Sequence, residues 1–190
     1  MQYAEKKQYI SPEEYFEMEE AAEYKSEYYH GEIFAMSGAS HNHNIIAGNT
    51  YVSLHISLRD SDCVVYASDM KIQVDEAMHY TYPDISIVCG DIEFADNRDD
   101  IVANPVVIVE VLSESTMDYD RGSKFVSYKN IKSLEDYILI NQYNCNIEYF
   151  YKSEAGKWNL EEYKNLNDVL KIKSLNIELP LNTIYDRVRW

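Results

Sequence analysis

Carboxylates interrupt two of the most apolar stretches of this chain. Residues 105–113, PVVIVEVLS, are almost all β-branched and apolar, as expected of a central strand covered on both faces, yet they contain Glu110. Asp84 stands at the entry to a second such stretch, residues 85–88. Because alternate side chains of a strand share a face, Glu110 is predicted to point the same way as its apolar neighbour Ile108. A carboxylate there has to be neutralised, paired or bound to a cation.

The spacing of apolar positions predicts three helices. A capping box that starts at Ser11, with Pro12 at the first helical position, predicts a short acidic helix that ends near Ala22. A helix packed on the core is predicted over about residues 43–58, and residues 118–131 predict a third helix. The apolar residues that place the second helix on the core are Ile45, Ile46, Val52 and Ile56.

Strand patterns fill most of the remaining chain. Hairpins are predicted to turn at Gly31 and near Ala155 and Gly156. Further strands are expected within residues 63–69, 70–75, 80–88 and 135–141, and a last strand with a short helix within residues 175–188. The acidic residues 91–104 show no clear pattern. This order of elements predicts a single α/β or α+β domain that spans residues 1–190.

The charge balance narrows the possible functions. With 33 acidic and 17 basic residues the formal net charge is −16, which repels anionic polymers at long range and excludes a general nucleic-acid coat protein. A site-specific enzyme remains compatible with this charge, because local positive potential or bound cations can offset it. The apolar content of 46% over 190 residues indicates a globular domain that is large enough to bury a core.

Cysteine usage and the chain start bear on the compartment. Cys63, Cys89 and Cys145 are an odd number without C-x-x-C spacing, so we interpret them as buried free thiols in a reducing compartment rather than as a disulfide framework or zinc site. The opening residues MQYAEKKQYI lack the apolar region of a signal sequence. No segment approaches the ~18 apolar residues of a membrane span. We therefore expect a cytoplasmic protein that does not insert into membranes.

The two interrupting carboxylates together predict a metal site. Two carboxylates from adjacent strands commonly hold Mg²⁺ or Mn²⁺ through oxygen ligands. A lysine nearby would complete a site for phosphodiester hydrolysis, and Lys124 in the third helix is the candidate. Taken singly, each residue has a plainer interpretation. Asp84 follows Pro83 and could be a solvated turn residue, and Lys124 could be a solvated helix residue.

Several segments in a fixed order resemble one known family. The segments YPDISIVC, PVVIVEVLSEST, GSKFVSYKNI and EDYILIN resemble the Uma-type putative restriction endonuclease family, a branch of the PD-(D/E)XK nuclease superfamily. The resemblance extends upstream to GEIFAMSGASHNHNII and covers about residues 10–180. It implies a restriction-endonuclease-like fold, that is, a mixed β-sheet core flanked by helices, with extra antiparallel strands.

The resemblance also implies roles for individual residues. Asp84 and Glu110 would be metal ligands, and the backbone carbonyl of Val111 would be a further ligand. The superfamily's usual E-x-K motif is not kept here, because Leu112 stands where the lysine is expected. In the resembling branch a lysine in the following helix takes that place, and in this chain it is Lys124.

Four further residues are auxiliary candidates. Tyr128, one turn beyond Lys124, would line the same side of the site. His43 matches a histidine that recurs in the family, and a helix-capping or core histidine is the alternative. Glu32 and Asp69 would each supply an extra carboxylate, unless they belong to a turn or a surface salt bridge. The 18 tyrosines could stack on unpaired bases, but their spread through strand segments mostly fits sheet packing.

These observations predict a Mg²⁺- or Mn²⁺-dependent endonuclease that hydrolyses phosphodiester bonds in DNA. Because cleavage of both strands of a duplex usually requires two sites related by a two-fold axis, we expect a homodimer. The alternative is a catalytically weakened nuclease fold that acts as a binding or regulatory protein, which the missing E-x-K lysine and the net charge favour. A glycoside hydrolase that uses Asp84 and Glu110 is a third hypothesis, but nothing else in the chain suggests a sugar cleft.

Overall fold

A six-stranded mixed sheet forms the centre of the molecule. The structure is a computed structural model that describes residues 9–36, 38–75 and 78–190. The strands follow the order β11-β10-β9-β8-β6-β3, and only β8 and β9 are parallel neighbours. They are β3 (Cys63–Ala67), β6 (Ile85–Cys89), β8 (Val107–Leu112), β9 (Asp136–Asn141), β10 (Ile147–Lys152) and β11 (Trp158–Tyr163). β8 is interior and buried along its whole length, as its apolar run predicts.

A five-stranded sheet carries the N-terminal hairpin. Its order is β2-β1-β5-β4-β7, and only β4 and β7 are parallel. The strands are β1 (Ser26–Tyr29), β2 (Glu32–Ala35), β4 (Lys71–Asp75), β5 (His79–Thr81) and β7 (Ile101–Val102). α1 (Pro12–Ala21) precedes the hairpin and begins with the predicted capping box between Ser11 and Glu14. The predicted turn is also confirmed, with Gly31 at a φ of 92°.

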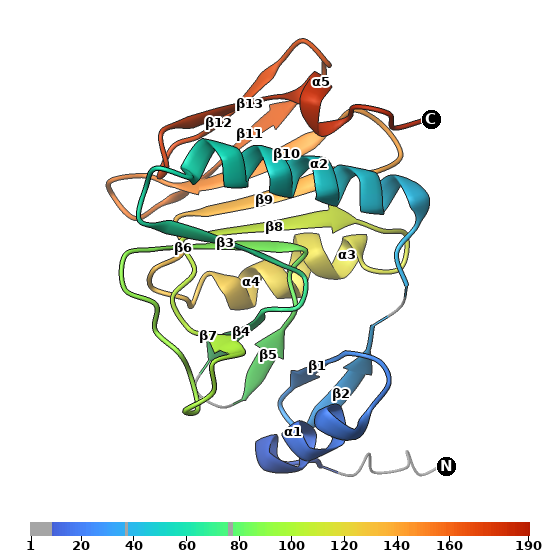
Figure 1. The fold of residues 1–190 in the computed structure, drawn as a ribbon, viewed down its shortest axis with the longest axis vertical. Helices are drawn as coiled ribbons and strands as arrows, with labels where there is room; N and C mark the ends of the chain where they lie inside the picture. The colour runs from blue at the N-terminus through green and yellow to red at the C-terminus, as the bar shows by residue number, and fades with distance from the viewer. Residues whose placement is uncertain (1–8, 37, 76–77) are drawn as a thin grey trace, which may run out of the picture.

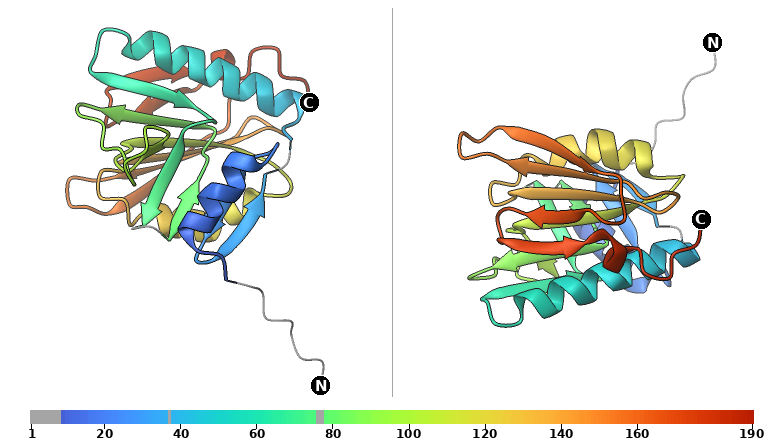
Figure 2. Two further views of the ribbon diagram at one scale, coloured as in Figure 1. Left: turned by 60° about the horizontal axis from the view of Figure 1, so that its bottom comes forward. Right: turned by 90° about the horizontal axis from the view of Figure 1, so that it is seen from above.

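Helices cover both faces of the six-stranded sheet, and β8 and β9 lie between them (Figure 1). The elements are α2 (His41–Leu58), α3 (Met117–Tyr119), a π-helical turn (Asp120–Lys124), α4 (Phe125–Tyr128), α5 (Leu181–Ile184), β12 (Val169–Ile172) and β13 (Ile177–Pro180). α2, α5 and the β12–β13 pair lie on one face, and the segment from α3 to α4 lies on the other (Figure 2). The predicted architecture, a mixed sheet flanked by helices with extra antiparallel strands, is therefore confirmed.

The two faces of β8 contribute to two separate cores. Val107, Val109 and Val111 pack in the core beneath α2, whereas Ile108 and Leu112 pack with residues of α4 and β9. The contacts of the Glu110 side chain lie on the α3–α4 side, so the predicted alternation is confirmed.

Two helix predictions need correction. In α2, Val52 and Ile56 are exposed, because the stripe that faces the core follows a four-residue step instead. The buried stripe consists of Ile46, Thr50, Leu54 and Leu58. The helix predicted over residues 118–131 is interrupted by a kink, since Gly122, within Asp120–Lys124, leaves helical geometry with φ −103° and ψ −107°.

The acidic residues 91–104, which showed no pattern, contain the short strand β7.

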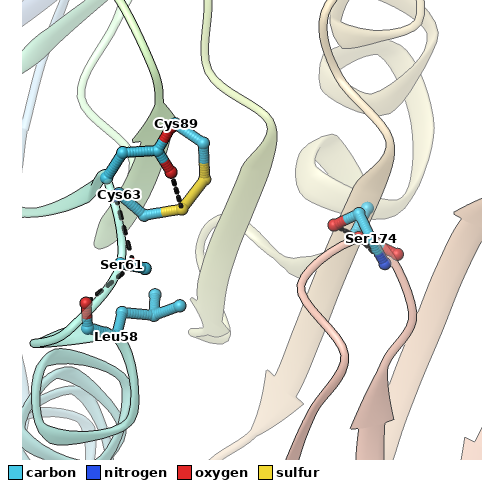
Figure 3. The surroundings of a disulfide bond; sticks show 7 residues. Leu58, Ser61, Cys63, Cys89 and Ser174 are labelled. Carbon is cyan, nitrogen blue, oxygen red and sulfur yellow. Dashed lines mark hydrogen bonds between the residues drawn. A yellow bond between two sulfur atoms is a disulfide. The ribbon is translucent and has the colours of Figure 1, made fainter.

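The interpretation of the cysteines is wrong for two of them. Cys63 and Cys89 form a disulfide between β3 and β6, where they are register partners (Figure 3). The pairing was missed because β4 and β5 separate these strands in the sequence. Cys145 is free and half-buried.

No helix within the described ranges is both long and apolar enough to cross a membrane. Residues 1–8, on which the prediction of a missing signal sequence partly depends, lie outside the described residues. A cytoplasmic location and a single domain over residues 1–190 stay predictions.

Candidate active site

Asp84 lies at the entry to β6, beside the end of β8. Its Oδ2 accepts a hydrogen bond of 2.7 Å from the backbone N–H of Val111, and its Oδ1 lies 2.8 Å from Nε2 of His43. His43 reaches this position from the first turn of α2, which Ser40 caps by accepting a hydrogen bond from the His43 backbone. Asp84 is thus fixed by two elements that are far apart in the sequence and is not a solvated turn residue.

Glu110 lies next to Asp84 on the neighbouring strand β8. The backbone N–H of Asp84 points at Oε2 of Glu110 at 3.4 Å, and the hydroxyl of Tyr128 donates to Oε1 at 3.1 Å. The Glu110 side chain is buried. Burial, together with the neighbouring carboxylates of Asp120 and Asp84, raises the pKa of Glu110 well above its ordinary value.

Lys124 is buried at the end of the π-helical turn. It is 4% exposed, and its Nζ lies 2.9 Å from Oε1 of Glu110. Two further carboxylates surround the same ammonium, Glu27 at 3.0 Å and Asp120 at 3.6 Å. Burial alone would lower the pKa of Lys124, but these carboxylates outweigh it and raise the pKa well above its ordinary value. The interpretation of Lys124 as a solvated helix residue is therefore wrong.

Glu27 is a site residue that the sequence analysis missed. It comes from β1, and its Oε1 accepts hydrogen bonds from Nζ of Lys124 and from the backbone N–H of Tyr82, at 3.0 and 3.1 Å. No local signal identifies it, because its burial depends on how the N-terminal hairpin packs against the central sheet. Asp120 was also missed, although it stands one helical turn before Lys124 and this spacing is visible in the sequence.

The two extra carboxylates that were predicted do not join the site. Glu32 lies in the β1–β2 hairpin opposite Tyr29 and does not line the cavity described below. Asp69 has a side chain that is 90% exposed and forms an ion pair of 2.6 Å with Lys25. Asp69 thus forms the surface salt bridge that was its alternative, whereas Glu32 is the first residue of β2.

The backbone of Val111 faces Asp84. Its N–H donates to the Asp84 carboxylate, and the N–H and C=O of one strand residue point to the same side, so its carbonyl is also directed towards Asp84. Tyr128 lies on the Lys124 side of the site, as predicted, and its hydroxyl bridges Glu110 and Thr81. The geometry therefore brings together Asp84, Glu110, Val111, Lys124, Tyr128 and His43.

The donor set suits a hard divalent cation. The carboxylates of Glu27, Glu110 and Asp120 surround the single ammonium of Lys124, and Asp84 lies next to Glu110, so carboxylates outnumber ammonium groups at the site. Among the residues that the structure describes, no group of three or more His, Cys, Asp or Glu side chains is arranged to hold a metal. Mg²⁺ does not require such a cage, because it keeps several waters and is commonly bound through one or two carboxylates. Asp84, Glu110 and the Val111 carbonyl fit that pattern.

The site lies in a large cavity of about 1530 Å³. The walls come from the N-terminal hairpin, the first half of α2, the segment after β8 and the π-helical turn. Small-molecule pockets usually have about 300–1,000 Å³, so this cavity can take a larger ligand.

Comparisons with known proteins agree with this fold. A solved structure of a "putative nuclease belonging to DUF820" from Anabaena variabilis is similar at a TM-score of 0.76 and 16% identity, covering 93% of this chain and 97% of that chain. Two uncharacterized proteins of Synechocystis sp. are similar in sequence. One, slr1290, is 37% identical over 93% of this chain and 91% of its own length, and the other, sll1609, is 34% identical over 88% and 95%.

The sequence model of the family described as "Uma2: Putative restriction endonuclease" matches residues 12–182. This match covers every residue that lines the cavity and all six residues that the geometry brings together. The chain therefore belongs to the Uma2 family of putative restriction endonucleases.

Proposed function

We propose that this protein is a metal-dependent endonuclease that hydrolyses phosphodiester bonds in DNA. The observation that carries the proposal is the meeting of Asp84, Glu110 and Lys124 in one cavity, with Nζ of Lys124 at 2.9 Å from the Glu110 carboxylate. These residues come from the entry to β6, from β8 and from the π-helical turn, so the fold itself assembles them. Family membership supports the nuclease class.

Asp84 and Glu110 would hold the cation, together with the carbonyl of Val111. When bound, Mg²⁺ or Mn²⁺ supplies Lewis-acid polarisation of a phosphate oxygen and lowers the pKa of a bound water. The hydrogen bond from the Val111 N–H and the contact with His43 fix the orientation of the Asp84 carboxylate. A ligand held in one orientation binds the cation without a further loss of side-chain freedom on binding.

Lys124 would stabilise charge rather than accept a proton. Because the surrounding carboxylates raise its pKa well above its ordinary value, the side chain stays an ammonium at neutral pH. An ammonium beside Glu110 can donate hydrogen bonds to an attacking water or to the phosphate oxygen on which negative charge develops. Tyr128 and Glu27 hold Glu110 and Lys124 in place for this role.

A cleavage assay with matched variants tests the proposal. Labelled DNA is incubated with the protein in Mg²⁺, in Mn²⁺ and in EDTA, and the same is done for Asp84→Asn and Asp69→Asn. Asp69 is the control, since it is an aspartate outside the cavity. We expect cleavage that requires the metal, is lost in Asp84→Asn and is kept in Asp69→Asn. Cleavage that persists in EDTA or in Asp84→Asn contradicts the proposal.

A second candidate function is a nuclease fold that binds nucleic acid but no longer cleaves it. The observation that favours it is the near-complete burial of Lys124 among three carboxylates, which leaves its ammonium little access to a substrate. The cleavage assay, together with a measurement of DNA binding, separates the two functions. DNA binding without cleavage, in either metal and on every DNA tested, would favour the second candidate.

A homodimer is the oligomeric state expected if the substrate is a DNA duplex cut on both strands. Two copies related by a two-fold axis would place one Asp84–Glu110 site on each strand of a duplex. Sedimentation velocity at several protein concentrations measures the oligomeric state, and a monomer at all concentrations contradicts the dimer.

A further inference from the structure

Exposed aromatic rings line the cavity around the Asp84–Glu110 site. Tyr24 and Tyr29 come from the N-terminal hairpin region and are 64% and 44% exposed. Tyr143 follows β9 and is 49% exposed. These rings come from segments that are more than a hundred residues apart in the sequence but border the same cavity. Sheet packing does not explain them, because packed tyrosines of this chain such as Tyr28 and Tyr80 are fully buried.

Two of these rings are held at their edges. The hydroxyl of Tyr143 accepts a hydrogen bond of 3.0 Å from the backbone N–H of Glu114, and Tyr29 packs edge-on against His79 at 4.9 Å between ring centroids. Contacts of this kind restrict the rotation of a ring while a large part of its surface stays exposed. A ring that is already oriented loses little conformational freedom when a flat ligand stacks on it.

The charges of the cavity do not suit a DNA duplex. Among the described residues that line it, Lys25 and Lys124 are the only lysines or arginines, and both are already paired with carboxylates. Duplex DNA carries one negative charge per ~1.7 Å of helix axis, and proteins bind it largely through lysines and arginines that neutralise its phosphates. Glu114 adds a further carboxylate to the lining. The lining therefore offers few cationic side chains for the phosphates of a duplex.

We infer that the substrate enters this cavity as an unpaired DNA strand, whose bases stack on Tyr24, Tyr29 and Tyr143. Stacking on aromatic side chains is the usual way in which proteins hold single strands without reading their sequence. The inference rests on the proposed nuclease function and names the substrate class of the same site. An unpaired strand needs one active site per chain, so this substrate does not require the two-fold dimer.

Binding to matched oligonucleotides tests the inference. Fluorescence anisotropy in Ca²⁺ compares one labelled single strand, the same strand in a blunt duplex, and that duplex with a central loop of unpaired nucleotides. We expect the single strand and the looped duplex to bind at least ~10-fold more tightly than the blunt duplex. Tyr24→Ala and Tyr143→Ala should each weaken single-strand binding by roughly 10-fold, within the range measured for loss of one base–aromatic stack.

The controls separate stacking from a general loss of structure. Tyr143→Phe keeps the ring and should keep most of the affinity. Phe94→Ala removes a ring of nearly equal exposure, 48%, outside the cavity and should bind like the unchanged protein. Equal or tighter binding of the blunt duplex overturns the inference. Single-strand binding that neither tyrosine variant weakens also overturns the inference. The exposed rings would then belong to an interface between protein copies.

Cleavage of the same three oligonucleotides distinguishes this inference from the proposed function. Single-strand binding that depends on the tyrosines, but without cleavage in Mg²⁺ or Mn²⁺, contradicts the nuclease function and supports the substrate class. Metal-dependent cleavage that is fastest on the blunt duplex supports the nuclease function and overturns the substrate class.

Discussion

The two faces of β8 differ in how they are stabilised, although they belong to one strand. Val107, Val109 and Val111 pack beneath α2 in a core of apolar side chains. On the opposite face Glu110 lies among Lys124, Tyr128 and further carboxylates. Buried charges add little net stability compared with apolar packing, because their desolvation offsets much of their attraction. We infer that the Glu110 face of β8 serves the proposed reaction and that the valine face stabilises the fold.

The largest expected effect is the loss of cleavage in Glu110→Gln. Glutamine keeps the size of the side chain but removes the charge that would bind the cation. Because a bound metal contributes several kcal/mol to transition-state stabilisation, we expect cleavage to fall by more than ~10³-fold. Single-turnover cleavage rates in Mg²⁺ measure this, and a rate within tenfold of the unchanged protein contradicts a ligand role for Glu110.

The second expected effect is slower chemistry in Lys124→Ala without a loss of metal binding. Lys124 donates no lone pair to a cation, so Mn²⁺ affinity should stay nearly unchanged, while cleavage falls by at least ~10²-fold. Lys152→Ala is the control, because Lys152 is also paired with a carboxylate, Glu135, but does not line the cavity. Unchanged cleavage in Lys124→Ala would falsify the assignment of Lys124 to the reaction.

The valine face should respond in the opposite way. Val109→Ala removes two buried methyl groups and should lower the free energy of unfolding by about 2 kcal/mol. Cleavage per folded molecule should not change, because Val109 points away from the cavity. Urea denaturation gives the first quantity and the cleavage rate gives the second. If Val109→Ala abolishes cleavage while folded, the two faces are not separate in function.

Only those site residues that stand out in a local sequence pattern could be predicted. Strand alternation placed Glu110, and a charged residue inside an apolar run is visible without a structure. The pattern of the following helix placed Lys124 near it, although the kink at Gly122 was not predicted. Glu27 could not be found in this way, because its place in the site depends on long-range packing of the N-terminal hairpin. Glu32, in the same hairpin, was chosen instead.

The fold too could be predicted only where it depends on local sequence. Individual β-strands and hairpins follow from the alternation of apolar residues and from turn residues, as at Gly31 and Gly156. The division of the strands into two main sheets, and the β3–β6 pairing that joins Cys63 to Cys89, depend on contacts between distant segments. On α2, Val52 and Ile56 misled the prediction because apolar residues also occur on exposed helix faces.

Stability and Mn²⁺ binding should both depend on pH through Glu110. Because the folded state raises the pKa of Glu110, its proton stabilises the folded protein at low pH, and this contribution is lost as pH rises through the raised pKa. Mn²⁺ binding should change in the opposite direction, weakening up to ~10-fold per pH unit below that pKa, since the cation requires the ionised carboxylate. Denaturation and Mn²⁺ titrations from pH 5 upwards test this. Glu110→Gln should remove the Glu110 contribution to both trends.

The smallest expected effect is that of Asp69→Asn. Asp69 forms an exposed ion pair with Lys25, and such pairs contribute at most about 1 kcal/mol. Thermal unfolding and cleavage should both be nearly unchanged. A clear loss of Mn²⁺ binding in Asp69→Asn would show that the metal site extends beyond the cavity.

Calorimetric titration of Mn²⁺ into the intact protein and into Glu110→Ala tests most directly whether Asp84 and Glu110 share a cation. Circular dichroism first establishes that the variant is folded. We predict that the intact protein binds Mn²⁺ and that Glu110→Ala does not. Equal binding by both proteins, or no binding by either, would contradict a metal site built on Asp84 and Glu110.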